Sequence, residues 1–138
     1  LEADGTPIDL TRVATPSFVQ AGREDHIAPA ESVWRITRHF TGPMEFLLAG
    51  SGHIAGVVNP PARKKRSYWV GADDAALPGD PNAWLADAVE HPGSWWTDWA
   101  QWLGMQAGPQ VRARSKLGNA RHRPIEPAPG RYVKVRAV

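Results

Sequence analysis

The fold of this chain is decided by two short β-prone runs, Thr15-Pro-Ser-Phe-Val-Gln-Ala21 and Met44-Glu-Phe-Leu-Leu-Ala49. Pro16 limits the first run to a strand that begins beside it, because proline cannot donate to a sheet ladder. The second run is nearly all apolar, as expected for a strand covered on both faces. Gly22-Arg-Glu-Asp25 breaks the first run as a turn, and Gly50-Ser-Gly52 ends the second.

A helix is predicted between the two strands. Pro29 suits its first turn, where the missing N–H of proline is no loss. Val33, Ile36 and Phe40 form one apolar stripe, and Thr41-Gly-Pro43 ends the helix. Strand, helix and strand make a βαβ unit, which requires parallel strands and a right-handed crossover. Because two strands do not make a stable sheet alone, we expect the rest of the sheet to lie upstream of this chain.

The second half of the chain has a different pattern. Residues 56–80 are predicted to be loop and include the basic run Arg63-Lys-Lys-Arg66. Asp80 as N-cap and Pro81 as first helical residue predict a helix that runs to about Glu90.

A further helix is predicted to begin at Ser94 and to end near Gly104. Large aromatic residues at helical spacing are usually core. We therefore expect the tryptophans of these two helices to form a helix–helix core or a subunit contact, with binding of an apolar polymer as the alternative: Trp84, Trp95, Trp96, Trp99 and Trp102. Near the end of the chain, Arg131-Tyr-Val-Lys-Val-Arg136 alternates apolar and basic residues and predicts a last strand.

These patterns predict an α/β protein with three parts, namely a βαβ unit over residues 1–55, a loop with Trp-rich helices over 56–110, and a basic tail over 111–138. Residues 1–110 hold 8 Lys and Arg against 13 Asp and Glu, whereas residues 111–138 hold 8 against 1. The tail suits an anionic partner or, more simply, the acidic remainder of the same protein. We expect no membrane span, because no apolar run reaches about 20 residues, and no nucleic-acid partner, because no nucleic-acid-binding module is recognisable.

Two residues with catalytic chemistry follow the two predicted strands. Asp25 lies in the turn after the first strand, and His53 follows the second, 28 positions later. Parallel strands bring these loops to one edge of the sheet, where ligands bind. A carboxylate that accepts from one imidazole nitrogen leaves the other nitrogen free to take a proton from a nucleophile. Acid before histidine is also the chain order of α/β-hydrolases.

His26 competes with Asp25 for the site, and we favour Asp25, because adjacent residues point in different directions. The simpler interpretation of either residue alone is an ordinary loop position. The basic run at 63–66 is expected to be a solvated loop, with attraction of anionic phosphates as the alternative.

Four longer stretches of the sequence resemble a known protein family. They are Ala21-Gly-Arg-Glu-Asp-His-Ile-Ala-Pro29, Leu48-Ala-Gly-Ser-Gly-His-Ile-Ala-Gly-Val-Val-Asn-Pro-Pro61, His91-Pro-Gly-Ser-Trp-Trp-Thr-Asp-Trp99 and Ile125-Glu-Pro-Ala-Pro-Gly-Arg-Tyr-Val-Lys134. Together they resemble the C-terminal part of class I poly(3-hydroxyalkanoate) synthases, over essentially the whole chain.

The resemblance implies the C-terminal portion of an α/β-hydrolase fold with a Cys–His–Asp triad. The family joins (R)-3-hydroxyacyl groups, 3-hydroxybutyryl among them, from coenzyme A thioesters into a polyester and releases coenzyme A. Asp25 and His53 match its catalytic Asp and His. The resemblance further implies no cofactor or metal, a homodimer as the full-length enzyme, and a cytoplasmic location at the surface of polyester granules.

The departure from the family pattern is the nucleophile. The family carries it in a Gly-x-Cys-x-Gly elbow upstream, whereas this chain has no Cys and starts at Leu1. We therefore expect this chain alone to be inactive and marginally stable. The alternatives are a fragment of an esterase or depolymerase of the same fold, and a non-catalytic module that binds polyester granules.

Overall fold

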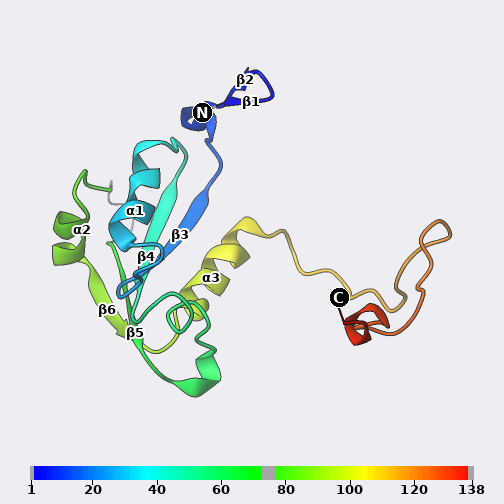
Figure 1. Cartoon of the computed structure of the whole chain (residues 1–138). Helices are drawn as coiled ribbons and strands as arrows, with labels where there is room; N and C mark the ends of the chain where they lie inside the picture. Colours follow the sequence, from blue (N-terminus) through cyan, green and yellow to red (C-terminus); the bar gives the residue numbers. More distant parts are fainter. Residues whose placement is uncertain (1, 73–76, 137–138) are drawn as a thin grey trace. The chain divides into compact units, whose positions relative to one another are not determined.

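The two predicted strands form and pair in parallel (Figure 1). They are β3 (Ser17–Gly22) and β4 (Met44–Ala49), in a register that sets Ser17 opposite Met44 and Gly22 opposite Ala49. The parallel pair and the apolar character of β4 confirm the prediction, because the last four residues of β4 are all buried. The computed structural model describes residues 2–72 and 77–136. Its contacts divide the chain into two units, residues 1–107 (unit 1) and 108–138 (unit 2).

The sheet has two more strands, which the sequence patterns did not predict. They are β5 (Ser67–Val70) and β6 (Val89–Pro92), and both pairings, β4 with β5 and β5 with β6, are antiparallel. The described residues thus make a mixed sheet in the order β3-β4-β5-β6, with β3 at one edge. The prediction of loop over 56–80 was therefore wrong at 67–70, and its residues 73–76 lie outside the described part.

The helix between β3 and β4 is shorter than predicted. It begins as α1 (Ala30–Trp34) and continues as the 3-10 turn η2 (Arg35–Arg38). The predicted apolar stripe also missed its main anchor, because Trp34 is only 1% exposed. The tighter 3-10 turn rotates the later residues away from an ideal helical stripe.

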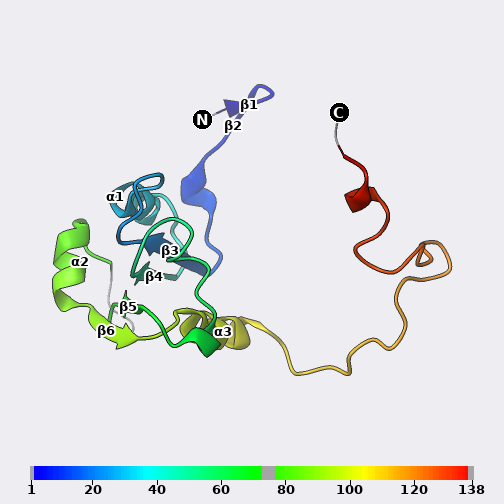
Figure 2. The same ribbon diagram turned by 60° about the horizontal axis from the view of Figure 1, so that its bottom comes forward.

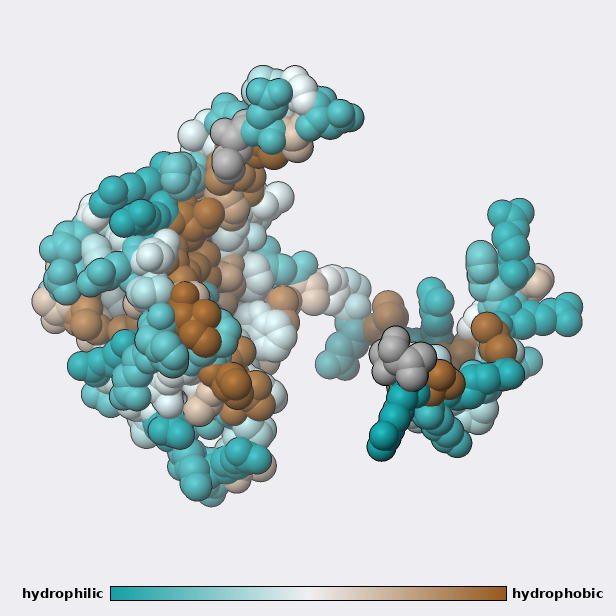
Figure 3. All heavy atoms as spheres, viewed as in Figure 1, coloured by the Kyte–Doolittle hydropathy of each residue, from teal (hydrophilic) through white to brown (hydrophobic). Residues whose placement is uncertain are grey.

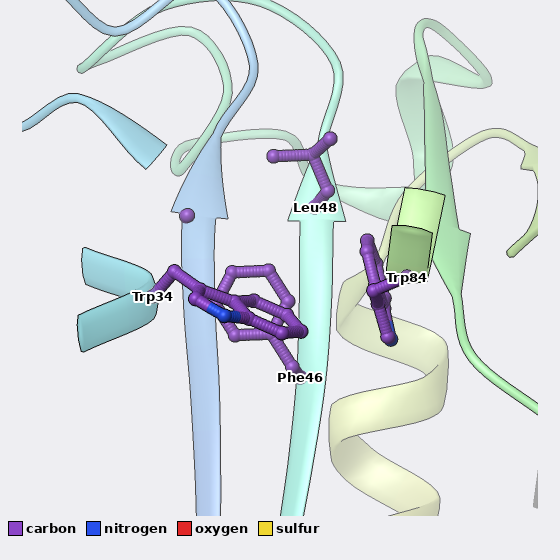
Figure 4. Packing of buried hydrophobic residues seen from close by; sticks show 5 residues of the cluster. Trp34, Phe46, Leu48 and Trp84 are labelled. Carbon is purple, nitrogen blue, oxygen red and sulfur yellow. The ribbon is translucent and has the colours of Figure 1, made fainter. Parts of the chain in front are cut away.

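Alternate residues of β4 point to opposite faces of the sheet, and each face has its own core. Phe46 and Leu48 pack with Trp34 and Trp84 on one face, as Figure 4 shows. The ring centroids of Trp34 and Phe46 are 4.6 Å apart, and those of Phe46 and Trp84 are 5.1 Å apart, both edge-to-face. Leu47 belongs to the second core, on the other face.

The helices cover these two faces separately (Figure 2). α2 (Pro81–Asp87) joins α1 on the first face, and α3 (Trp96–Gln106) covers the second, where Trp95 packs with Leu47. Asp80 caps α2 as predicted, by accepting the Asn82 N–H at 3.0 Å. This helix ends before Glu90 because residues 89–92 pair with β5 instead. Trp84 and Trp95 are core residues as predicted, but they do not pack helix against helix, because the sheet separates them.

The two ends of the chain carry short elements. β1 (Glu2–Ala3) and β2 (Thr6–Pro7) form a hairpin, followed by the 3-10 turn η1 (Leu10–Arg12). The strand predicted at 131–136 is wrong, because this stretch holds the 3-10 turn η4 (Tyr132–Lys134), and none of the described residues of unit 2 offers it a pairing strand. Within the described residues, no helix is long and apolar enough to cross a membrane.

Truncation of Leu47 is expected to destabilise unit 1 strongly. This side chain is fully buried in the second core, and removal of a buried leucine side chain to alanine costs about 2–5 kcal/mol. Urea unfolding of Leu47→Ala measures that loss. Leu117→Ala is the matched control, because Leu117 is 77% exposed and should change the free energy of unfolding by less than about 0.5 kcal/mol. Equal losses in the two variants would contradict the assigned core.

Candidate active site

The parallel ladder continues past the ends of β3 and β4 into the two loops that follow them. The Arg23 N–H donates to the Ala49 carbonyl at 2.8 Å, and the Glu24 N–H donates to the Ser51 carbonyl at 3.2 Å. The loop that carries Asp25 is thereby fixed to the loop that carries His53.

Asp25 and His53 meet at this edge of the sheet. Oδ2 of Asp25 lies 2.7 Å from Nδ1 of His53. The other carboxylate oxygen, Oδ1, accepts the N–H groups of Ile27 at 2.8 Å and Ala28 at 2.9 Å. The Asp25 side chain is 6% exposed and the His53 side chain 46% exposed. The carboxylate is therefore enclosed, while part of the imidazole remains accessible.

The hydrogen bonds to Asp25 also determine its charge. The Ala28 N–H is the main cause of a lowered Asp25 pKa, and it is helped by His53 and by the Ile27 N–H against the opposing effect of burial. Asp25 is thus ionised at neutral pH. Because an ionised carboxylate only accepts hydrogen bonds, the contact requires a hydrogen on Nδ1 of His53, and in the neutral form of this ring Nε2 then carries the lone pair. This is the state of a general base.

The backbone is tightly packed around the pair. A Cβ atom added at Gly22 would lie 3.1 Å from Cβ of Asp25 and 3.2 Å from the Ser51 carbonyl oxygen, so this position leaves little space for a side chain. Ser51 itself has φ of +89°. A non-glycine residue in this region is strained, and such strain concentrates at functional sites where the surroundings impose it.

The other sequence candidates lie differently. His26 is exposed, and the short contact to His53 comes from Asp25. The basic run at residues 63–66 is exposed throughout. Sequence reasoning missed the part played by Trp95 and Trp96, whose indole N–H groups donate to the main chain of the His53 loop. The Trp95-Trp96 pair near the start of a helix is the one local signal, and such a pattern by itself favours core packing.

Charge on Asp25 is expected to make stability depend on pH. The pKa of Asp25 is lower in the folded protein than in the unfolded chain. The contribution of the charged carboxylate to stability is therefore present above about pH 4 and is lost as the pH falls further. Asp25→Asn should therefore destabilise the protein more at pH 7 than at pH 3. Urea midpoints of both proteins at the two pH values measure this, with Asp87→Asn, at an exposed position, as control. An equal decrease of the urea midpoint in Asp25→Asn at both pH values would contradict an ionised, hydrogen-bonded Asp25 carboxylate.

Comparison with known proteins places this geometry in context. The chain is 50% identical over 133 residues to the poly(3-hydroxyalkanoate) polymerase subunit PhaC of Cupriavidus necator, which covers 96% of this chain and 22% of that protein. It is 46% identical over 136 residues to poly(3-hydroxyalkanoate) polymerase 2 of Ectopseudomonas oleovorans, which covers 99% of this chain and 24% of that protein. The subunit of the same name from Rhizobium etli is 47% identical over 133 residues, or 96% of this chain and 20% of that protein.

No family model matches the chain. The chain spans about a fifth to a quarter of the length of these curated relatives. Nearly all of it is homologous to a segment of the poly(3-hydroxyalkanoate) polymerases, and this confirms the resemblance found in its sequence.

Proposed function

We propose that this chain supplies the general base and its orienting carboxylate to a polyester-forming acyltransferase. The reaction joins (R)-3-hydroxyacyl groups, with 3-hydroxybutyryl as the expected unit, from coenzyme A thioesters into a polyester. The observation that carries the proposal is the 2.7 Å contact between Asp25 and His53 Nδ1, in a chain homologous to polymerases of this kind.

In the proposed mechanism, Nε2 of His53 takes the proton from a thiol, because the thiolate is the attacking form. The thiolate attacks the carbonyl carbon of the hydroxyacyl thioester, the bond from that carbon to the coenzyme A sulfur breaks, and the departing sulfur takes the proton back from the imidazolium. His53 then removes the proton from the 3-hydroxyl group of a second hydroxyacyl unit, whose oxygen attacks the new acyl thioester. The ester bond forms as the bond from the acyl carbon to the enzyme sulfur breaks, and that sulfur takes the proton back from the imidazolium. The chain contains no Cys, so the proposed thiol belongs to residues outside it.

Two roles for Asp25 follow from the resemblance, orientation of His53 or activation of the incoming hydroxyl group. The hydrogen bonds favour orientation, because Oδ2 faces His53 and Oδ1 already accepts two backbone N–H groups. An ionised Asp25 also stabilises the imidazolium that forms when His53 takes a proton.

The surface near the pair suits an apolar acyl chain. Figure 3 shows a band of apolar residues on one face of unit 1. Beside Asp25 and His53 in the sequence, Ile27 is 65% exposed, Ile54 73% and Val58 56%. A contiguous apolar patch on a protein surface is typical of a site that contacts a ligand or a partner. It supports the (R)-3-hydroxyacyl thioester and the growing polyester as partners.

We extend the proposal to the fold and setting of the full-length protein. The parallel β3–β4 pair and the position of β3 at the edge of the described sheet support the C-terminal portion of an α/β-hydrolase fold, whose remaining strands would add beside β3. A homodimer and a location at polyester granules rest on the homology alone. The relatives above are named polymerases, which favours this proposal over an esterase, a depolymerase or a granule-binding module.

Replacement of His53 tests the proposed base. In the full-length polymerase that contains these residues, His53→Ala should lower the rate of coenzyme A release from 3-hydroxybutyryl-CoA by about 10²–10⁴-fold, because the general base is lost. His26→Ala is the matched control and should stay within about twofold of wild type, because the His26 side chain is exposed and the contact to His53 comes from Asp25.

The 138-residue chain assayed alone is a second control, and it should release no coenzyme A above the blank. Wild-type rates in His53→Ala, or a rate loss in His26→Ala as large as that in His53→Ala, would contradict the assignment of His53. Coenzyme A release by the isolated chain would contradict a nucleophile outside it.

A further inference from the structure

The loop that carries His53 has a regular backbone of its own. The Gly56 N–H donates to the Gly52 carbonyl and the Val58 N–H to the Ile54 carbonyl, both at 2.8 Å. These bonds between residues four apart form helix-like turns around His53. A Cβ atom added at Gly56 would lie 2.8 Å from the Gly52 oxygen, so the turns close too tightly for a side chain there.

Two tryptophans at the start of α3 hold this loop from outside. Nε1 of Trp95 donates to the Gly56 carbonyl at 2.8 Å, and Nε1 of Trp96 donates to the Val57 carbonyl at 2.9 Å. The acceptors are consecutive main-chain oxygens, three and four residues after His53. The indole N–H is the donor in both bonds. Each bond fixes one indole ring relative to the main chain of the loop.

The Trp95 ring and the main chain at Trp96 are themselves held in place. Trp95 is 9% exposed in the second core, and its ring is stacked on Phe18 of β3, with centroids 6.4 Å apart. The main-chain N–H of Trp96 donates to the Ser94 hydroxyl at 3.1 Å. The end of the loop is fixed as well, because the Asn59 side-chain amide donates to the carbonyls of Lys65 and Gly93 at 3.0 and 3.2 Å.

We propose that Trp95 and Trp96 are positioning residues for His53. They touch no reacting atom and act through the main chain of the loop, which they keep in the conformation that holds the imidazole against Asp25. A site that must be accurate to a fraction of an ångström needs such support from rigid elements. The inference rests on the proposed function, because it assigns the tryptophans a role only if His53 is the base.

The experiment compares Trp96→Phe, Trp95→Phe and the double variant in the full-length polymerase, with Trp99→Phe as control. Trp99 lies on the same helix and contacts the Trp95 ring at 6.0 Å, but the loop bonds come from the other two indoles. Because Trp95→Phe replaces the bicyclic indole by a smaller ring and so also disturbs the core, a further protein carries 3-benzothienylalanine at position 95. This residue keeps the ring shape and lacks the N–H.

Two measurements separate the structural effect from the catalytic one. Hydrogen exchange of the peptide over residues 52–59 reports on the loop independently of catalysis, and it should be faster in every protein that lacks the Trp95 or the Trp96 indole N–H. The turnover rate should fall about fivefold for each lost bond, the value of one net hydrogen bond, with KM unchanged within about twofold. The pH profile of alkylation of the active-site thiol should move toward that of an ordinary thiol, because fewer molecules hold His53 in place.

Unchanged exchange in the 52–59 peptide would overturn the proposed support of the loop. Faster exchange with an unchanged turnover rate and alkylation profile would overturn its link to His53, as would equal effects in Trp99→Phe. Failure of the proposed function itself appears separately, as wild-type turnover in His53→Ala. In that case the exchange result still decides whether the indoles hold the loop.

Discussion

The parallel pairing of β3 with β4 is the constraint on which the candidate site depends. Two strands that point the same way end at the same edge, and their ladder continues into the loops through the bonds from Arg23 and Glu24. Asp25 and His53 are 28 positions apart in the chain, and this ladder removes most of the freedom that would otherwise separate them. A slip of one residue in the register would turn the buried side chains of β4 to the wrong faces.

The two cores on either side of β4 give this edge a rigid base. One core joins Trp34, Phe46 and Trp84, and the other joins Leu47 and Trp95. The second core has a further consequence, because Trp95 belongs both to it and to the support of the His53 loop. The same side chain thus links packing of the sheet to the position of the imidazole.

Much of the fold was predictable from local sequence. The rest was not predictable, because it depends on contacts between segments far apart in the chain. The apolar run at 44–49, the turn at Asp25 and the Asp80-Pro81 helix start carry strong local signals, and each formed as predicted. β5 and β6 are only four residues long, and Val89–Pro92 became a strand because β5 offered it a partner. The alternating run at 131–136 shows the converse, since its pattern favours a strand but none of the described residues of unit 2 pairs with it.

The candidate site likewise has features that local sequence predicts and features that depend on distant contacts. Order along the chain and the two strand ends predicted that Asp25 and His53 would approach each other. No local pattern reports a bond across 39 positions, such as that from the Trp95 indole to the Gly56 carbonyl. The backbone N–H groups of Ile27 and Ala28 that keep Asp25 ionised likewise became visible only in three dimensions.

The most direct test is the position of the ring proton on His53. Nitrogen-15 NMR of the histidine-labelled full-length protein, with the signal assigned by its loss in His53→Gln, distinguishes the two neutral forms of the ring. Near pH 8 we expect the proton on Nδ1, shared with Asp25, and a free lone pair on Nε2. A proton on Nε2 in the resting protein would contradict the proposal that His53 is a base oriented by Asp25.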